Sequence, residues 1–301
     1  MSPSLWPLLR SGAVLLCGLS VLSAQGKDGF TNFESPGVKP ITTARIADHD
    51  FVLVCNTPDD SVEIWDVHGP RFVARVPVGL RPVSVLWVPK LSRFYTANHL
   101  GDSVSMVRLA WSPRSNRLDV QHERTEWVGD EPRMLALAPD GHSLLVTLGS
   151  QSAVGWRRLG DLGPLLPGFS ERIHLVDDYA QPRSAVQTPG AILSQGNSLY
   201  VLGFRGGDSF AHDHDLWSFD FGSLKVGKLA GLGSIKPMMA FASNGDLYVL
   251  SWQSQNRLLG EPAVAAARTG FVESHLLRIK GLAAGKPVVE DRDLHLDAQG
   301  Q

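Results

Sequence analysis

Three residues with the chemistry of a serine hydrolase stand close together in the stretch FYTANHLGDSVSMV. His99, Asp102 and Ser103 are the residue types of a general base, an orienting acid and a nucleophile. A hydrolase fold assembles its triad from distant chain segments, however, and the base has to be unique. The same Asp-Ser-Val recurs at residues 60–62, where the position of His99 is taken by a threonine. The recurrence predicts side chains that cap the backbone of a turn between strands, and no catalytic residue is predicted.

The second stretch that could do chemistry is RGGDSFAHDHDLWSF. In an extended chain His212 and His214 point to the same face, and two imidazoles at that spacing can share Zn²⁺ or Cu²⁺. A further protein ligand is required, which Asp208 or the distant His174 or His275 would supply. A solvated loop with incidental histidines explains the same pattern. A divalent metal therefore remains an alternative, and no other cofactor is predicted.

Two long polar loops near these histidines carry side chains suited to recognising a polar ligand or a partner protein. In repeat folds such loops gather at one end of the molecule and form binding sites. Ordinary variation of loop length is the alternative explanation. The predicted binding residues are Arg205, Trp252, Gln255, Asn256 and Arg257.

A repeat positions all of these residues. After residue 36 the sequence divides into units of roughly 40 to 55 residues, a period typical of repeat folds. Within a unit a short apolar strand is followed by a turn such as PDGHS, a second strand such as RFYTAN, a polar loop and a third strand, and several units add a fourth strand. Each unit opens with a proline after a polar residue, at Pro40, Pro82, Pro132, Pro182 and Pro237.

Four short strands in each unit predict an all-β fold, a β-propeller with about five recognisable four-stranded blades. One such blade cannot bury both of its faces, and stacking blades around an axis covers them. A β-sandwich is the alternative architecture, but it does not explain the recurring order of proline, strand, turn and loop.

The stretches NTPDDSVEIWDV, VPVGLRPVSV, ANHLGDSVSMV and VGDEPRMLALAPDGHSLLV resemble YVTN-type propeller repeats. The resemblance covers residues 36–160 well and the fourth and fifth units in outline only. It implies rings of seven blades, so closure by five blades and an incomplete ring of a longer protein are both open. It also implies an alternative function, a lactonase-like or quinoprotein-like enzyme that would use the His212 and His214 loop.

The first 24 residues have the layout of a signal peptide. A lone Arg10 precedes an uncharged apolar run that ends in small residues, and cleavage is expected near Ala24. Export to the periplasm or the extracellular space follows, without stable insertion in a membrane; an uncleaved anchor is the alternative. Residues 25–37 are then a lead-in, 38–290 the repeats and 291–301 a polar tail.

The remaining composition narrows the class of function. The 301 residues carry a net charge of −2 and no basic run, which argues against nucleic acid as a partner. Cys55 is the one cysteine left after cleavage, and its apolar surroundings predict a buried, inert thiol. We therefore expect a non-catalytic scaffold that binds a protein or a polar ligand through its loops.

Overall fold

The computed structural model describes residues 37–69, 71–159, 171–174, 188–204, 215–223, 226–229, 231–254 and 272–293. Side chains are described in all of these ranges except at 171–174, 253–254, 272–273 and 292–293. Within the described ranges, the chain has no helix of the length and hydropathy that crossing a bilayer requires.

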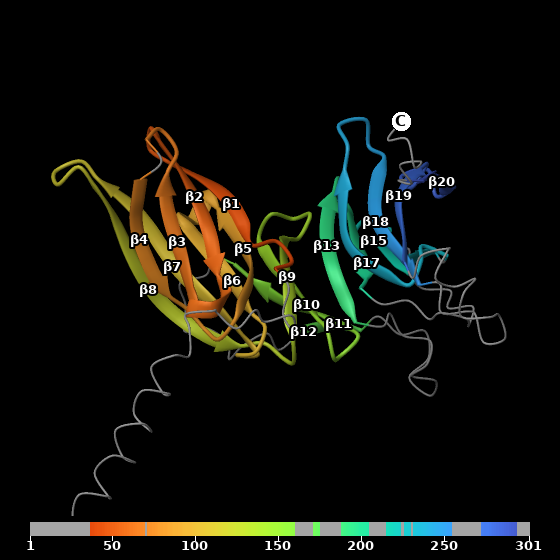
Figure 1. The fold of residues 1–301 in the computed structure, drawn as a ribbon, viewed down its shortest axis with the longest axis horizontal. Coiled ribbons are helices and arrows are strands. Elements are labelled where there is room, and N and C mark those ends of the chain that lie inside the picture. The colour runs from red at the N-terminus through yellow and green to blue at the C-terminus, as the bar shows by residue number, and fades with distance from the viewer. Residues whose placement is uncertain are drawn as a thin grey trace, which may run out of the picture. The chain divides into compact units, whose positions relative to one another are not determined.

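The described residues form five antiparallel sheets of four strands each, here called blades 1 to 5 in chain order (Figure 1). Strands that are neighbours in a blade are also neighbours in the sequence, so every blade is a simple meander. Two short 3₁₀ turns, Thr57–Asp59 and Pro89–Leu91, lie between strands. Blade 1 contains β1 (Ile41–Ile46), β2 (His49–Asn56), β3 (Ser61–Asp66) and β4 (Arg71–Pro77), and blade 2 contains β5 (Pro82–Val88), β6 (Arg93–Asn98), β7 (Ser103–Ser112) and β8 (Arg117–Trp127).

The other three blades repeat this arrangement. Blade 3 contains β9 (Pro132–Leu137), β10 (Ser143–Leu148), β11 (Ala153–Arg158) and β12 (Glu171–His174). Blade 4 contains β13 (Pro189–Gln195), β14 (Ser198–Gly203), β15 (Leu216–Asp220) and β16 (Val226–Leu229). Blade 5 contains β17 (Ile235–Phe241), β18 (Leu247–Ser254), β19 (Val272–Lys280) and β20 (Val288–Asp293), which ends beyond the repeat boundary predicted at residue 290.

The pattern of buried side chains along a strand differs between blades. In β2 the buried residues alternate, so that Phe51, Leu53 and Cys55 face the core that blade 1 shares with blade 2. In β10 every side chain is buried, as expected for a strand covered on both faces. Cys55 is buried as predicted, and burial raises the pKa of its thiol to about 12, which keeps the thiol protonated and unreactive.

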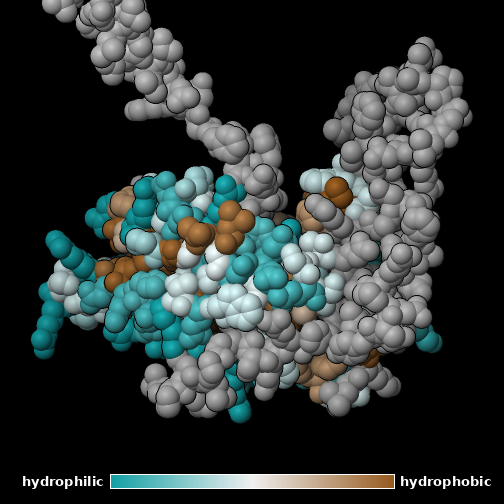
Figure 2. Space-filling view, turned by 90° about the horizontal axis from the view of Figure 1, so that it is seen from below, coloured by the Kyte–Doolittle hydropathy of each residue, from teal (hydrophilic) through white to brown (hydrophobic). Residues whose placement is uncertain are grey.

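One face of blades 1 and 2 is mainly hydrophilic (Figure 2). On the face seen in Figure 2, the hydrophobic side chains over the blades at the left of Figure 1 form small groups among polar ones. Scattered apolar residues of this kind are normal on a globular protein.

The first strands of successive blades lie beside one another, β1 next to β5, β5 next to β9, β9 next to β13 and β13 next to β17. The lead-in before β1 also joins this group. The backbone of Lys39 pairs in parallel with Ser84 of β5, with hydrogen bonds to Val83 and from Val85. Val38 packs against the hydrophobic core of blades 3 to 5.

Two of the predicted repeat prolines need correction. The first strand of blade 4 begins at Pro189 rather than at Pro182. Thr188 before it has a φ of 53°, which matches Arg81 and Glu131 before the first strands of blades 2 and 3. In blade 5 the strand begins at Ile235, and Pro237 lies inside it. The register shift between Ile235 and Met238 accommodates this proline, since a bulge needs no ladder hydrogen bond there.

Candidate functional site

Most of the predicted site residues lie outside the described ranges, so the metal site and the loop site remain predictions. The residues concerned are Arg205, Asp208, His212, His214, Gln255, Asn256 and Arg257. The described part of the chain contains no cluster of three or more His, Cys, Asp or Glu side chains that would hold a metal ion.

Three other residues from those predictions are described at least in part. Trp252 had been predicted to lie in a loop. It lies instead in β18, where it pairs with Ser274 of β19, and it is 37% exposed. His275 in β19 has its Nδ1 atom 2.9 Å from Oδ2 of Asp291. His174 lies in β12, of which only the backbone is described.

In the hydrolase-like stretch, the side chains of Ser103 and Asp102 bind different partners and not each other. Ser103 Oγ accepts a hydrogen bond from Nδ2 of Asn98 at 3.1 Å. Asp102 Oδ1 accepts one from the backbone N–H of Glu131 in blade 3. His99 is buried. In the described part of the chain no hydrogen bond joins it to Ser103, and its Nδ1 atom has no hydrogen-bond partner.

The recurring Asp has a role that differs from the predicted cap: it connects consecutive blades. Asp60 Oδ1 accepts the backbone N–H of Arg81 at 2.7 Å, and Asp102 Oδ1 accepts that of Glu131 at 3.1 Å. Both acidic residues have left-handed backbones, with φ of 50° and 47°. Asp tolerates this conformation better than most residues, and its short side chain then reaches the next blade. Ser152 adopts the same φ at the corresponding place in blade 3.

The junction of blades 4 and 5 adds a buried charge to this connection. Asp215, the last residue of the HDHD stretch, accepts the backbone N–H of Leu232 with Oδ2 at 2.7 Å. Its Oδ1 atom lies 2.8 Å from Nζ of Lys236, a fully buried ammonium that also donates to the carbonyl of Gly233. Burial lowers the pKa of Lys236, and the attraction of Asp215 opposes that shift. This ion pair connects blades 4 and 5, and both carboxylate oxygens of Asp215 have a partner.

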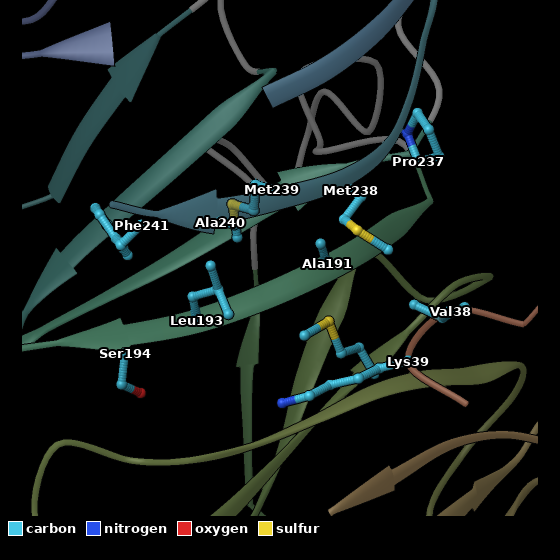
Figure 3. A pocket seen from close by; sticks show the side chains of 11 residues that line it. Val38, Lys39, Ala191, Leu193, Ser194, Pro237, Met238, Met239, Ala240 and Phe241 are labelled. Atoms are coloured by element: carbon cyan, nitrogen blue, oxygen red, sulfur yellow. The ribbon is translucent and has the colours of Figure 1, made fainter. Parts of the chain in front are cut away.

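A pocket of about 360 Å³ lies among the first strands of blades 3 to 5 and the lead-in, and we call it the Lys39 pocket (Figure 3). Its size falls in the range of small-molecule sites. Three methionines and several other apolar side chains form most of its wall. The lining residues are Val38, Lys39, Met134, Ala191, Leu193, Ser194, Pro237, Met238, Met239, Ala240 and Phe241.

Lys39 is the one ionisable side chain among the residues that line the pocket. Figure 3 shows this side chain extended, with its nitrogen directed toward the side of the pocket where Leu193 and Ser194 lie. Among the described residues its ammonium has no ion pair and no hydrogen bond, and burial lowers its pKa below the usual 10.5. The Ser194 hydroxyl is already donated to the carbonyl of Leu137. The pocket therefore offers an apolar wall and one uncompensated positive charge.

Sequence reasoning missed this pocket. Lys39 was noticed only as the polar residue before a repeat proline, and the adjacent Met238 and Met239 carried no motif. An isolated lysine beside an apolar strand start is the signal that could have been followed. Its meaning depends on which first strands lie opposite it, and that is a property of the assembled blades.

Comparison with known proteins supports the fold. Hydrazine synthase from Kuenenia stuttgartiensis aligns with a TM-score of 0.63 at 18% identity, over 89% of this chain and 69% of that one. A putative 6-phosphogluconolactonase from Bacteroides uniformis gives a TM-score of 0.54 at 11% identity, over 83% of this chain and 72% of that one. Virginiamycin B lyase from Staphylococcus aureus gives a TM-score of 0.53 at 10% identity, over 85% of this chain and 70% of that one.

These neighbours are propeller proteins, and the chain is an all-β propeller with four-stranded blades, which confirms the predicted fold class. No family model and no curated protein matches the sequence. At such identities the likeness concerns the fold alone, because propellers carry many unrelated functions.

Proposed function

We propose that this chain is an exported propeller of the YVTN-repeat type that binds a small ligand without transforming it, and that the ligand occupies the Lys39 pocket. The single observation that supports this is the composition of the pocket wall: apolar side chains surround one ammonium. Binding sites for small molecules have this character, with a largely apolar surface and few polar groups that fix orientation.

The same wall argues against catalysis in this pocket. Acid–base and nucleophilic mechanisms need at least two groups that exchange or activate a proton. A lysine of lowered pKa can add to a carbonyl, but turnover of the imine requires a second acid or base. None of the other lining residues ionises, and the hydroxyl of Ser194 is engaged with Leu137.

A neutral apolar probe tests the proposal independently of charge. We expect 1-octanol to bind the dialysed protein in isothermal titration calorimetry and to raise its melting temperature. Ala240→Trp, which places an indole in the pocket from an exposed strand position, should abolish binding and leave the fold intact. Thr43→Trp is the matched control, because Thr43 is exposed on the first strand of blade 1 and does not line the pocket.

Two outcomes would contradict the proposal. Binding of 1-octanol that is equal in wild type and Ala240→Trp would place the ligand elsewhere. About one tightly held metal ion per chain after dialysis, lost when His212 and His214 are replaced by Ala, would favour the enzyme alternative instead.

A further inference from the structure

We infer that the ligand of the Lys39 pocket is a small amphiphilic carboxylate, an aliphatic or aromatic acid whose anionic group pairs with the Lys39 ammonium. The inference rests on the proposed function and adds the chemical class of the ligand. It is carried by the arrangement of charge and apolar surface around one side chain.

The position of Lys39 is fixed from its backbone. Its N–H donates to the carbonyl of Val83, and its carbonyl accepts the N–H of Val85, so the lead-in is held against β5 as a short parallel strand. From this anchored base the side chain extends along one side of the pocket (Figure 3). The backbone pairing therefore fixes the point from which the ammonium reaches the pocket.

The charge of Lys39 has no counter-charge among the described residues, whereas two other described lysines have one: the buried Lys236 and the partly exposed Lys280. Lys236 is paired with Asp215 at 2.8 Å, and Lys280 with Glu290. A partly desolvated ammonium without an acceptor is costly, and a carboxylate supplied by a ligand would remove that cost. A cationic ligand would be repelled, and a neutral one would leave the ammonium unpaired.

The apolar side chains of the pocket wall favour a ligand with an apolar tail. Met134 and Met239 are buried, and Met238 borders the pocket while being 51% exposed. Methionine adapts its shape to aliphatic and aromatic groups alike, which suits an apolar tail more than a sugar or a nucleotide. A volume of about 360 Å³ lies at the lower end of the range for small-molecule sites, so the ligand is small.

Three probes of equal chain length test this inference by calorimetry: octanoate, 1-octanol and octylammonium. In the wild type we expect octanoate to bind about tenfold or more tightly than 1-octanol, the factor of one charge-assisted hydrogen bond, and octylammonium to bind most weakly. Lys39→Met should remove the preference for octanoate and keep the affinity for 1-octanol. Lys39→Arg, which keeps the charge, should retain the preference.

A second measurement uses the unaltered protein. Octanoate should protect Lys39 from an amine-acylating reagent, read by peptide mass spectrometry, while 1-octanol at equal occupancy should protect it less. If 1-octanol binds and octanoate binds no more tightly, the carboxylate class is wrong and the proposed binding function stands. If neither probe binds, the proposed function itself fails.

Discussion

The junction of blades 2 and 3 and the junction of blades 4 and 5 use the same hydrogen bond in different electrostatic settings. In both, an aspartate at the start of the third strand accepts a backbone N–H from the segment that enters the next blade. Asp102 is partly exposed and needs no counter-charge. Asp215 is 6% exposed and is paired with the ammonium of Lys236.

The difference shows how a repeat keeps its geometry while its chemistry changes. A carboxylate near the surface is stabilised by water as well as by the N–H that it accepts. A carboxylate as deeply buried as Asp215 loses that water and requires a cation instead. Lys236 lies at the register shift between Ile235 and Met238, and its ammonium reaches this carboxylate from there.

The largest expected effect is at the charged junction. Lys236→Met leaves the Asp215 carboxylate buried without its counter-charge, and we expect a loss of about 3–5 kcal/mol in the free energy of unfolding, measured with urea. Combining it with Asp215→Asn, which keeps an acceptor for the Leu232 N–H, should recover most of the loss. Equal stability of the single and double variants would show that the charge is not the cause.

A smaller effect is expected at the uncharged junction. Asp102→Ala removes the acceptor of the Glu131 N–H and places Ala in a left-handed backbone, so we expect a loss of about 1–3 kcal/mol in the same measurement. Asp102→Asn retains the acceptor and tolerates this backbone, and should stay within about 0.5 kcal/mol of wild type. A similar loss in both variants would mean that the negative charge matters here too.

The smallest expected effect is a dependence of the free energy of unfolding on pH, caused by His99 in blade 2. Burial first, and then the positive charge of Arg133, lowers the pKa of His99 below its usual 6.5. Between these two values the unfolded chain binds more protons, so the free energy of unfolding rises with pH, by at most about 1.4 kcal/mol per unit.

The check is urea unfolding of wild type and His99→Gln from pH 5 to 7.5. The variant should show a smaller increase, since the other titrating groups are shared. Parallel profiles for the two proteins would contradict a contribution from His99.

Much of the fold could be predicted because the same pattern of strands and loops recurs several times in the sequence. The Asp-Ser-Val copies identified equivalent loops, and Asp60 and Asp102 indeed share a conformation and a type of partner. Their partner was missed because it is a backbone N–H, 21 residues away for Asp60 and 29 residues away for Asp102, which has no signature in residue type. Pro182 was predicted to open the fourth unit for a related reason: the left-handed conformation of Thr188, which precedes the observed strand start at Pro189, is not visible in the sequence.

The candidate site was less predictable. The His and loop residues attracted attention by their chemistry, whereas Lys39 and the methionines are ordinary residues in a repeat lead-in and an apolar strand. What makes them a site is the approach of first strands from three blades to one lysine. Spacing along one strand contains no information on that approach.

The backbone pairing of the lead-in with β5 has a consequence for the order of folding. Lys39 belongs to the start of the described propeller, while β17 at the other side of its pocket belongs to the last blade. Contacts between residues so distant in sequence form late, because closing the chain between them costs entropy before they are made. The pocket is thus completed only in molecules that have folded through blade 5. A bound ligand would then stabilise the propeller as a whole by mass action, and occupancy of the pocket would report that folding is finished.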